Sequence, residues 1–268
     1  MALSHLDGLT GTFISVATMA TLFWLISVWQ LNWEFWFSEA TLYFALAGVL
    51  FPALAQRLQI SAVKNVGPAF TAAFGAFLPL FATIPAVLYL DERVTLLQIL
   101  GICLLVGGLL LAAIARGVSL RNRVFYLLFL PLGAAMVRAI AQPLTKAGYK
   151  ILAEPIFATL VMTSVSTLVV GAMVIVFGVP RRLLSPGRGH ALFTLNGILV
   201  GTGFLAMQLS LVSGPVSLTA SLLSTIPIWT LVLGIFFFKN ESLKWWHGVV
   251  ALIVCVGTIM VVMGQADG

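Results

Sequence analysis

Arg138 is the residue whose position in this sequence most strongly suggests chemistry, because it lies within a long apolar segment. The segment is predicted to end near Thr145, so Arg138 would lie on the order of 10 Å from that end of a helix. Gln142 and Lys146 follow at intervals of four residues, and the three side chains therefore share one helix face. A guanidinium and an amide on one face could bind an anionic or carboxylate-bearing solute. The alternative is that Arg138 extends to the membrane surface beside Lys146.

Further polar and aromatic residues occur in three other apolar segments, where they could line the same cavity. They are Asn196 and Gln208, then Ser224, Thr225 and Trp229, and finally Phe77 and Thr83. Pro79 and Pro227 interrupt two of these segments, and each proline frees a backbone carbonyl that a neighbour or water must satisfy. Hydroxyl groups in apolar helices also bond one helix to another, so a packing role for the Ser and Thr residues stays open.

Residues for catalysis or metal binding form no recognisable pattern. His5, His190 and His247 are scattered, and the sequence has neither an H-E-x-x-H motif nor a phosphate-binding glycine loop. Cys103 and Cys255 both lie in apolar segments, which favours packing over a disulfide or a metal site. No Asp or Glu lies in the middle of an apolar segment, so no carboxylate that could carry a proton is visible. We therefore predict no enzyme activity, no cofactor and no metal site.

The composition predicts a membrane protein. Of the 268 residues, 61% are hydrophobic and only 8% are charged, whereas soluble domains contain about 25% charged residues. The apolar residues form long runs that suit membrane-spanning helices of about 20 residues rather than the short alternating strands of a barrel. The net charge of +6 is attributed to Lys and Arg residues that set membrane orientation, so no nucleic-acid partner is predicted.

About nine transmembrane helices are predicted, which gives an all-α polytopic membrane protein. They cover Leu9–Leu31, Ser38–Arg57, Val66–Leu90, Leu96–Ala115, Val124–Thr145, Pro155–Phe177, Ala191–Leu211, Val216–Phe238 and Trp245–Met263. The first segment is too long for the apolar part of a signal peptide and has no basic patch before it, so we expect a retained helix. The predicted location is the inner (plasma) membrane of the cell.

An internal repeat is visible as four landmarks that recur in the same order. They are Gly67-Pro68 and Gly214-Pro215, Pro79 and Pro227, Asp91-Glu92 and Asn240-Glu241, and Gly108 and Gly257. The segments that carry them are five spans apart, and five is odd, so equivalent helices would cross the membrane in opposite directions. Inverted repeats of this kind are common in secondary transporters.

The repeat assigns residues 1–117 to a first half of four helices and residues 118–268 to a second half of five. The spans pair in order, which leaves Val124–Thr145 without a partner, as in a bundle of five plus five helices that lacks the first one. Either the gene start is shortened or the protein works with nine helices.

These landmarks resemble the drug/metabolite transporter (DMT) superfamily, in its ten-helix EamA-like branch. The resemblance covers Ala45–Ala113, which includes Gly101, and Gly197–Met263. It implies a ten-helix DMT fold minus one helix, and a secondary transporter or exporter of small organic solutes such as amino acids, metabolites or drugs. The solute would cross the inner membrane by alternating access through a cavity between the halves. A non-transporting membrane subunit that partners another chain is the alternative, and a homodimer stays open.

The charged loops predict an orientation that differs from the one expected of this family. Ten of the fourteen Lys and Arg residues lie on the face shared with the N-terminus: Arg57, Lys64, Arg116, Arg121, Arg123, Arg181, Arg182, Arg188, Lys239 and Lys244. This bias predicts a cytoplasmic N-terminus. A ten-helix relative that lost its first helix would have this N-terminus outside, so both orientations stay open.

Overall fold

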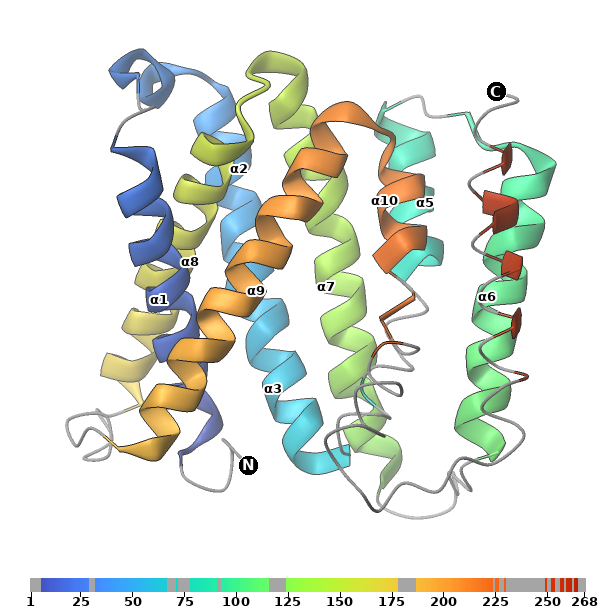
Figure 1. Ribbon diagram of the computed structural model, residues 1–268, viewed down its shortest axis with the longest axis horizontal. Coiled ribbons are helices and arrows are strands. Elements are labelled where there is room, and N and C mark those ends of the chain that lie inside the picture. The colour runs from blue at the N-terminus through green and yellow to red at the C-terminus, as the bar shows by residue number, and fades with distance from the viewer. Residues whose placement is uncertain are drawn as a thin grey trace. The chain divides into compact units, whose positions relative to one another are not determined.

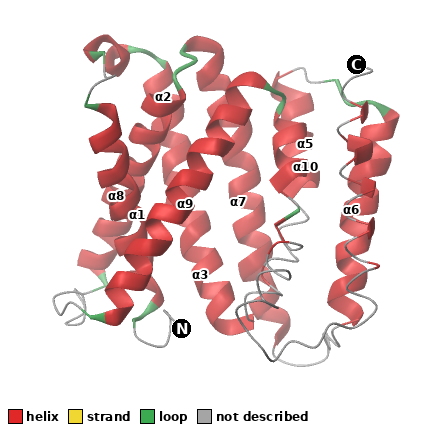
Figure 2. Ribbon diagram, viewed as in Figure 1, coloured by secondary structure: helices red, strands yellow, loops and turns green. Residues whose placement is uncertain are grey.

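The computed structural model describes residues 6–28, 32–66, 71, 78–90, 93–115, 124–177, 187–223, 225–226, 229, 249, 252–253, 256–257, 259–261 and 263–264. Every regular element within these ranges is a helix, and no strand is drawn there (Figure 2). In chain order the elements are α1 (Gly8–Ser27), η2 (Trp33–Phe37), α2 (Ala40–Gly48), η3 (Val49–Leu54), α3 (Ala55–Val66), α5 (Leu78–Leu90), α6 (Leu96–Ala115), α7 (Val124–Ile151), α8 (Pro155–Val176), α9 (Arg188–Ser213) and α10 (Val216–Leu223). The all-α prediction is confirmed.

Four of the described helices are long and apolar enough to cross a membrane. They are Gly8–Ser27, Ala40–Asn65, Pro155–Val176 and Arg188–Ser213. They overlap with four of the predicted spans, and the other predicted spans are helical at nearly every residue described within them. Two helices continue beyond their predicted ends: the span predicted to end at Arg57 continues to Asn65, and α7, predicted to end at Thr145, continues to Ile151. The chain is a polytopic membrane protein.

The chain folds into two compact units that do not coincide with the two sequence halves. Unit 1 contains Met1–Ser61 and Ile140–Gly214, and unit 2 contains Ala62–Ala139 and Pro215–Gly268. Each unit combines segments that the repeat pairs with one another. Helix α7 passes from unit 2 into unit 1 between Ala139 and Ile140. The assignment of residues 1–117 and 118–268 to two related repeats stays a prediction.

The core of unit 1 is built from α1, α2, α8 and α9. Helix α1 packs on α8 and α9, and α2 packs on α8 (Figure 1). Large side chains that are almost fully buried fill this core: Met19, Phe23, Phe44, Leu160, Met162 and Leu211. Because lipid tails are as apolar as these side chains, close packing and hydrogen bonds hold the helices together.

The contact between α1 and α9 depends on a glycine and a serine. A Cβ atom added to Gly197 would lie 2.6 Å from the carbonyl oxygen of Ser15, so only glycine permits this approach. Ser15 Oγ donates a hydrogen bond to the carbonyl of Phe193 over 3.1 Å, and Asn196 Nδ2 donates to Ser15 Oγ over 3.0 Å. Small and hydroxyl-bearing residues are typical of helix contacts in membranes.

The contact between α8 and α2 has the same components. The predicted repeat pairs α1 with α8 and the α2–α3 segment with α9, so this contact is the counterpart of the one between α1 and α9. A Cβ atom on Gly48 would lie 2.6 Å from the carbonyl oxygen of Met162. Ser166 Oγ donates to the carbonyl of Gly48 over 2.6 Å. The same kind of contact is thus made twice, which agrees with an internal repeat.

The repeat-related helices α1 and α8 begin differently. Asp7 caps α1: its Oδ2 accepts from the backbone N–H of Thr10 over 3.0 Å, and its Oδ1 accepts from Thr10 Oγ1 over 2.6 Å. Helix α8 begins instead with Pro155, and Glu154 before it makes no side-chain cap. Proline suits the first helical position because its fixed φ is helical and no N–H is needed there.

Pro52 and Pro143 lie inside helical segments and were not singled out by the sequence analysis. Phe51, beside Pro52 in the π-helical segment η3, has φ −141° and ψ 125°, so Ala40–Asn65 is bent rather than continuous. Pro143 lies within α7 and has no N–H to offer the carbonyl of Ala139. The carbonyl of Ala139 therefore lacks its usual partner where α7 passes from unit 2 to unit 1.

Within unit 2, α5 packs on α10, and α6 packs against helical residues near the C-terminus. Two glycines meet there, because a Cβ on Gly257 would lie 3.0 Å from the carbonyl oxygen of Gly101. Thr95 Oγ1 also donates to the carbonyl of Gly264 over 2.9 Å. Gly101 and Gly257, both named in the sequence analysis, therefore allow a close helix contact.

Candidate functional site

Two glutamine side chains in the core of unit 1 have open hydrogen-bonding atoms. Gln142 on α7 is 1% exposed, and Gln208 on α9 is 0% exposed. Neither the Oε1 nor the Nε2 of Gln142 has a hydrogen-bond partner, and the same holds for the Oε1 of Gln208. A buried polar group without a partner costs about 1–3 kcal/mol. These amides are therefore suited to bind a polar molecule.

Met162 on α8 connects the two helices that carry these amides. Its Sδ lies 2.9 Å from Nε2 of Gln208 and 3.8 Å from Oγ1 of Thr145 on α7. Thr145 comes three residues after Gln142, so Gln142 lies about one helical turn from this sulfur along the same side of α7. Met162 thus contacts Gln208 on α9 and Thr145 on α7, and we call the group of Gln142, Thr145, Met162 and Gln208 the amide site.

Lys146 fixes α7 against α9 one turn beyond Gln142. Its Nζ donates to the carbonyls of Leu211, Val212 and Gly214 over 2.6, 3.3 and 2.9 Å. The last carbonyls of a helix lack intrahelical partners and carry partial negative charge, so an ammonium group is well placed there. This contact gives a reason for α7 to extend beyond Thr145. It also means that the Lys146 charge is directed to α9 and not to the amide site.

Aromatic residues lie next to this cluster along the chain. Phe204, one turn before Gln208, packs edge-on against Phe51 with 5.1 Å between ring centroids. Tyr149, one turn beyond Thr145, packs on Phe44 at 5.3 Å. The amide site is therefore a polar cluster with buried aromatic pairs on adjacent turns.

Comparison with known proteins identifies the family. The model of the EamA-like transporter family matches residues 1–114 and 125–263. The chain belongs to the EamA-like transporter family. This membership places it in the DMT superfamily, as the sequence motifs predicted.

The fold agrees with a solved structure. One crystal structure superposes on this EamA-like chain with a TM-score of 0.74 and 14% sequence identity, and the match covers 98% of this chain and 91% of the other. At this identity the likeness shows the shared fold alone. No curated protein sequence matches the chain significantly.

The structure places Arg138 and its predicted neighbour Gln142 one turn apart on the same helix. Both lie on α7 of the EamA-like chain, four residues apart, but Arg138 belongs to unit 2 and Gln142 to unit 1. Lys146, the third member of that face, binds the end of α9. The anion site around Arg138 stays a prediction, whereas the amide site is built within one unit.

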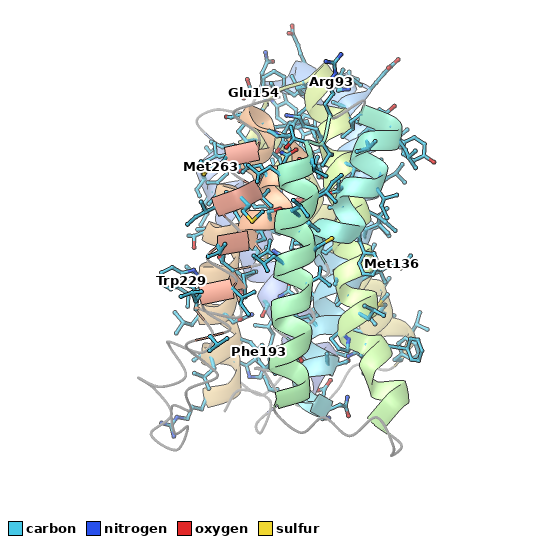
Figure 3. The ribbon with its side chains drawn as sticks, turned by 90° about the vertical axis from the view of Figure 1, so that its right-hand side faces the viewer. Arg93, Met136, Glu154, Phe193, Trp229 and Met263 are labelled. Carbon is cyan, nitrogen blue, oxygen red and sulfur yellow. The ribbon has the colours of Figure 1, made fainter. Side chains whose placement is uncertain are left out.

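The other predicted residues have varied surroundings. Asn196 is bonded to Ser15 and belongs to the α1–α9 contact. Thr225 Oγ1 donates to the carbonyl of Leu222 over 2.8 Å. Trp229 is 62% exposed and points away from the helices (Figure 3). Thr83 on α5 has a buried Oγ1 without a partner and stays a candidate within unit 2.

Some predicted residues fall elsewhere. Phe77, Ser224 and Pro227 lie outside the described residues. Pro79 is buried and is the second described residue of α5. Among the described residues, no group of three or more His, Cys, Asp or Glu side chains could hold a metal ion.

Sequence reasoning missed three polar groups of unit 1. Gln56 at the start of α3 is 6% exposed, and its Oε1 has no partner. The hydroxyl of Tyr149 is also buried without a partner. Thr145 could have been found from its spacing of three residues after Gln142. Gln56 could have been identified because it is a polar residue four positions after Pro52 within an apolar segment.

Proposed function

We propose that this EamA-like chain carries a small organic solute across the inner membrane as a secondary transporter, by alternating access. The family consists of membrane transporters of small solutes. Gln142 and Gln208 are the groups that we assign to solute binding. The observation that supports this assignment is the pair of buried amides with three open hydrogen-bonding atoms in one compact unit.

The hydrogen-bonded threonines of the same unit show why open amides are unusual there. Thr18 Oγ1 donates to the carbonyl of Ile14 over 2.7 Å, and Thr163 Oγ1 donates to that of Thr159 over 2.7 Å. A hydroxyl can return its hydrogen bond to its own helix, whereas a glutamine amide carries more donors and acceptors than one helix turn satisfies. Unsatisfied buried amides are therefore better explained by ligand binding than by packing.

The orientation that we propose places the N-terminus of the chain in the cytoplasm. The excess of Lys and Arg in the loops of the N-terminal face supports this orientation. A reporter fused at the N-terminus, together with cysteine labelling in the loop after Arg57, tests it in intact cells.

The test of transport is a tolerance screen followed by flux measurements in vesicles. Cells that overexpress the chain are exposed to amino acids, metabolites and toxic analogues, and a solute that gives altered tolerance is then measured in proteoliposomes. We expect Gln142→Leu to reduce its flux at least tenfold while membrane insertion is retained. Arg138→Ala tests the anion site in the same assay.

Two glutamines serve as matched controls. Gln98 is 2% exposed, but its Oε1 accepts from the backbone N–H of Thr95 over 2.8 Å, so it is buried and satisfied. Gln59 is exposed. Gln59→Leu should leave flux unchanged, and Gln98→Leu should affect stability rather than the Michaelis constant. Unchanged flux in Gln142→Leu and in Gln208→Leu would reject the assignment, and no flux of any solute would favour a non-transporting subunit.

A further inference from the structure

The end of helix α9 is built so that its own backbone does not satisfy all of its carbonyls. The last carbonyls of a helix have no N–H partner within the helix, and Gly214-Pro215 follows α9 directly. The backbone N–H of Gly214 donates to the carbonyl of Ser210 over 2.9 Å. The next carbonyl, that of Leu211, would receive the N–H of residue 215, but proline has none. The Gly-Pro landmark of the repeat therefore leaves this carbonyl to another donor.

Lys146 of α7 is that donor, and it reaches more than one carbonyl. Its Nζ donates to the carbonyls of Leu211, Val212 and Gly214 over 2.6, 3.3 and 2.9 Å. An ammonium group carries three N–H donors, and all three acceptors are backbone oxygens at the end of one helix. The contact thus consists of a cation from α7 and a group of carbonyl oxygens from α9, both within unit 1.

A group of carbonyl oxygens at a helix end is a means by which secondary transporters bind a coupling cation. In such proteins, unwound backbone carbonyls and the C-terminal ends of helices coordinate sodium ions or protons, and the partial negative charge of the helix end favours a cation. Two of the three distances around Nζ exceed the roughly 2.0–2.6 Å at which magnesium and calcium ions hold oxygens. The end of α9 therefore suits a monovalent cation.

We infer that the end of α9 is a monovalent-cation site whose ion the chain supplies itself, as the ammonium group of Lys146. The tethered ammonium group takes the place of a free coupling ion, so transport by this chain requires no sodium. The sodium independence rests on the proposed function, whereas the cation site does not.

The first test removes the tethered cation and offers a free one to the full chain purified in detergent. Lys146→Ala deletes the side chain beyond Cβ, and n-propylammonium supplies the same atoms. A ligand that binds only the folded state raises the unfolding midpoint as its concentration rises above its dissociation constant. We expect n-propylammonium chloride to raise the midpoint of Lys146→Ala by several degrees and to saturate. The wild-type midpoint should stay unchanged, because its site is occupied.

Tetramethylammonium is the matched control, because it carries the charge without N–H groups. At equal ionic strength it should leave the midpoint of Lys146→Ala unchanged, and n-propylammonium should leave that of Lys64→Ala unchanged, since Lys64 is exposed. Equal shifts with the two cations, or no shift with n-propylammonium, would overturn the inference.

A measurement on the wild-type chain does not depend on the folding of a variant. The Lys146 amine should be acylated more slowly than those of the exposed Lys64 and Lys150, by roughly tenfold or more, because hydrogen bonds to a charged group must open first. Equal rates of acylation, measured by mass spectrometry of the labelled peptides, would also overturn the inference.

Flux measurements separate this inference from the proposed function. For the solute found in the tolerance screen, wild-type flux in proteoliposomes should be the same in sodium chloride and in choline chloride. A wild-type flux that requires sodium would overturn the inference and leave transport intact. A midpoint of Lys146→Ala that n-propylammonium restores, in a chain that carries no solute, would contradict transport and leave the cation site intact.

Discussion

The two repeat-related contacts of unit 1 share their backbone geometry and differ in their polar side chains. At the α1–α9 contact, Ser15 receives a hydrogen bond from Asn196, and the amide is thereby engaged. At the α8–α2 contact, Ser166 binds the carbonyl of Gly48, and Met162 on the same helix contacts Gln208 of α9, whose Oε1 is open.

This difference suggests that polar side chains of unit 1 have two distinct roles, one in stability and one in solute binding. Both contacts hold helices together through a glycine and a serine. In the first contact the polar side chain is satisfied by its neighbour, so its expected role is structural. Next to the second, Gln208 on α9 contacts Met162 of α8 and keeps an open Oε1, and because an unsatisfied buried group is costly, its expected role is to bind a solute. The comparison is therefore testable through residues whose removal should have opposite effects.

The largest effect is expected from Lys146, which joins α7 to the end of α9. Lys146→Met would remove the ammonium group that binds three carbonyls, and we expect the free energy of unfolding to fall by about 3 kcal/mol, in line with hydrogen bonds to charged groups. Lys146→Arg, which keeps the charge, should recover part of this loss. Thermal unfolding in detergent measures it, with the exposed Lys64→Met as control. Equal midpoints for Lys146→Met and Lys64→Met would show that α7 does not depend on this contact.

The glycines of the two contacts should have similar, somewhat smaller effects. A methyl group at Gly48 or Gly197 would meet a backbone carbonyl at 2.6 Å, and overpacking of this kind costs about 1–3 kcal/mol. We expect Gly48→Ala and Gly197→Ala to lower the unfolding midpoint by comparable amounts. Gly203→Ala is the control, because nothing lies within 4 Å of its added Cβ. A loss at only one of the two glycines would break the equivalence of the contacts.

The amides themselves should change stability in opposite directions. Asn196→Leu removes a hydrogen bond to Ser15 and should cost about 1 kcal/mol, whereas Gln142→Leu removes an unsatisfied group and should leave stability unchanged or raise it by up to about 1 kcal/mol. Solute flux should show the reverse order, with the greater loss in Gln142→Leu. If Gln142→Leu destabilises the chain as much as Asn196→Leu does, the open amide has a structural role after all.

The smallest expected effect concerns the Asp7 cap at the start of α1, and it is a change in how the unfolding midpoint depends on pH. Burial raises the pKa of the Asp7 carboxyl, but the hydrogen bonds from the Thr10 side chain and backbone outweigh it, so the pKa lies below its ordinary value. The stabilisation is therefore fully present above the unfolded pKa of about 4 and is lost as the pH falls through the lower folded pKa. Asp7→Asn should weaken this acid dependence of the unfolding midpoint. Glu154→Gln should not, because Glu154 makes no cap on α8; an equal change in both variants would contradict this explanation.

The sequence predicts the helices well, because the apolar runs alone require them. It also identifies Gln142 and Gln208 as candidates, because polar side chains within such runs are few. It does not reveal that their amides are open, since this depends on which neighbours face them from α8 and α9. The sequence does not reveal the Lys146 contact either, because its acceptors are backbone carbonyls of residues with apolar or small side chains.

The repeat did not point to the helix break at Phe51. Pro79 and Pro227 were chosen because they recur in both halves, yet the break that the structure describes is at Phe51, beside a proline without a recognised counterpart. Arg138 and Gln142 illustrate a different limit. Helical spacing places them on one face, but which compact unit surrounds each side chain depends on packing across distant parts of the chain.

Pro143 has a mechanical consequence for α7. Because Pro143 has no N–H, α7 lacks one intrahelical hydrogen bond at this point. Bending the helix there therefore costs less, by about the value of one hydrogen bond, or roughly 1 kcal/mol. The residue immediately before it is Gln142, and the carbonyl that loses its usual N–H partner belongs to Ala139. A molecule that binds the Gln142 amide therefore binds α7 next to its missing hydrogen bond.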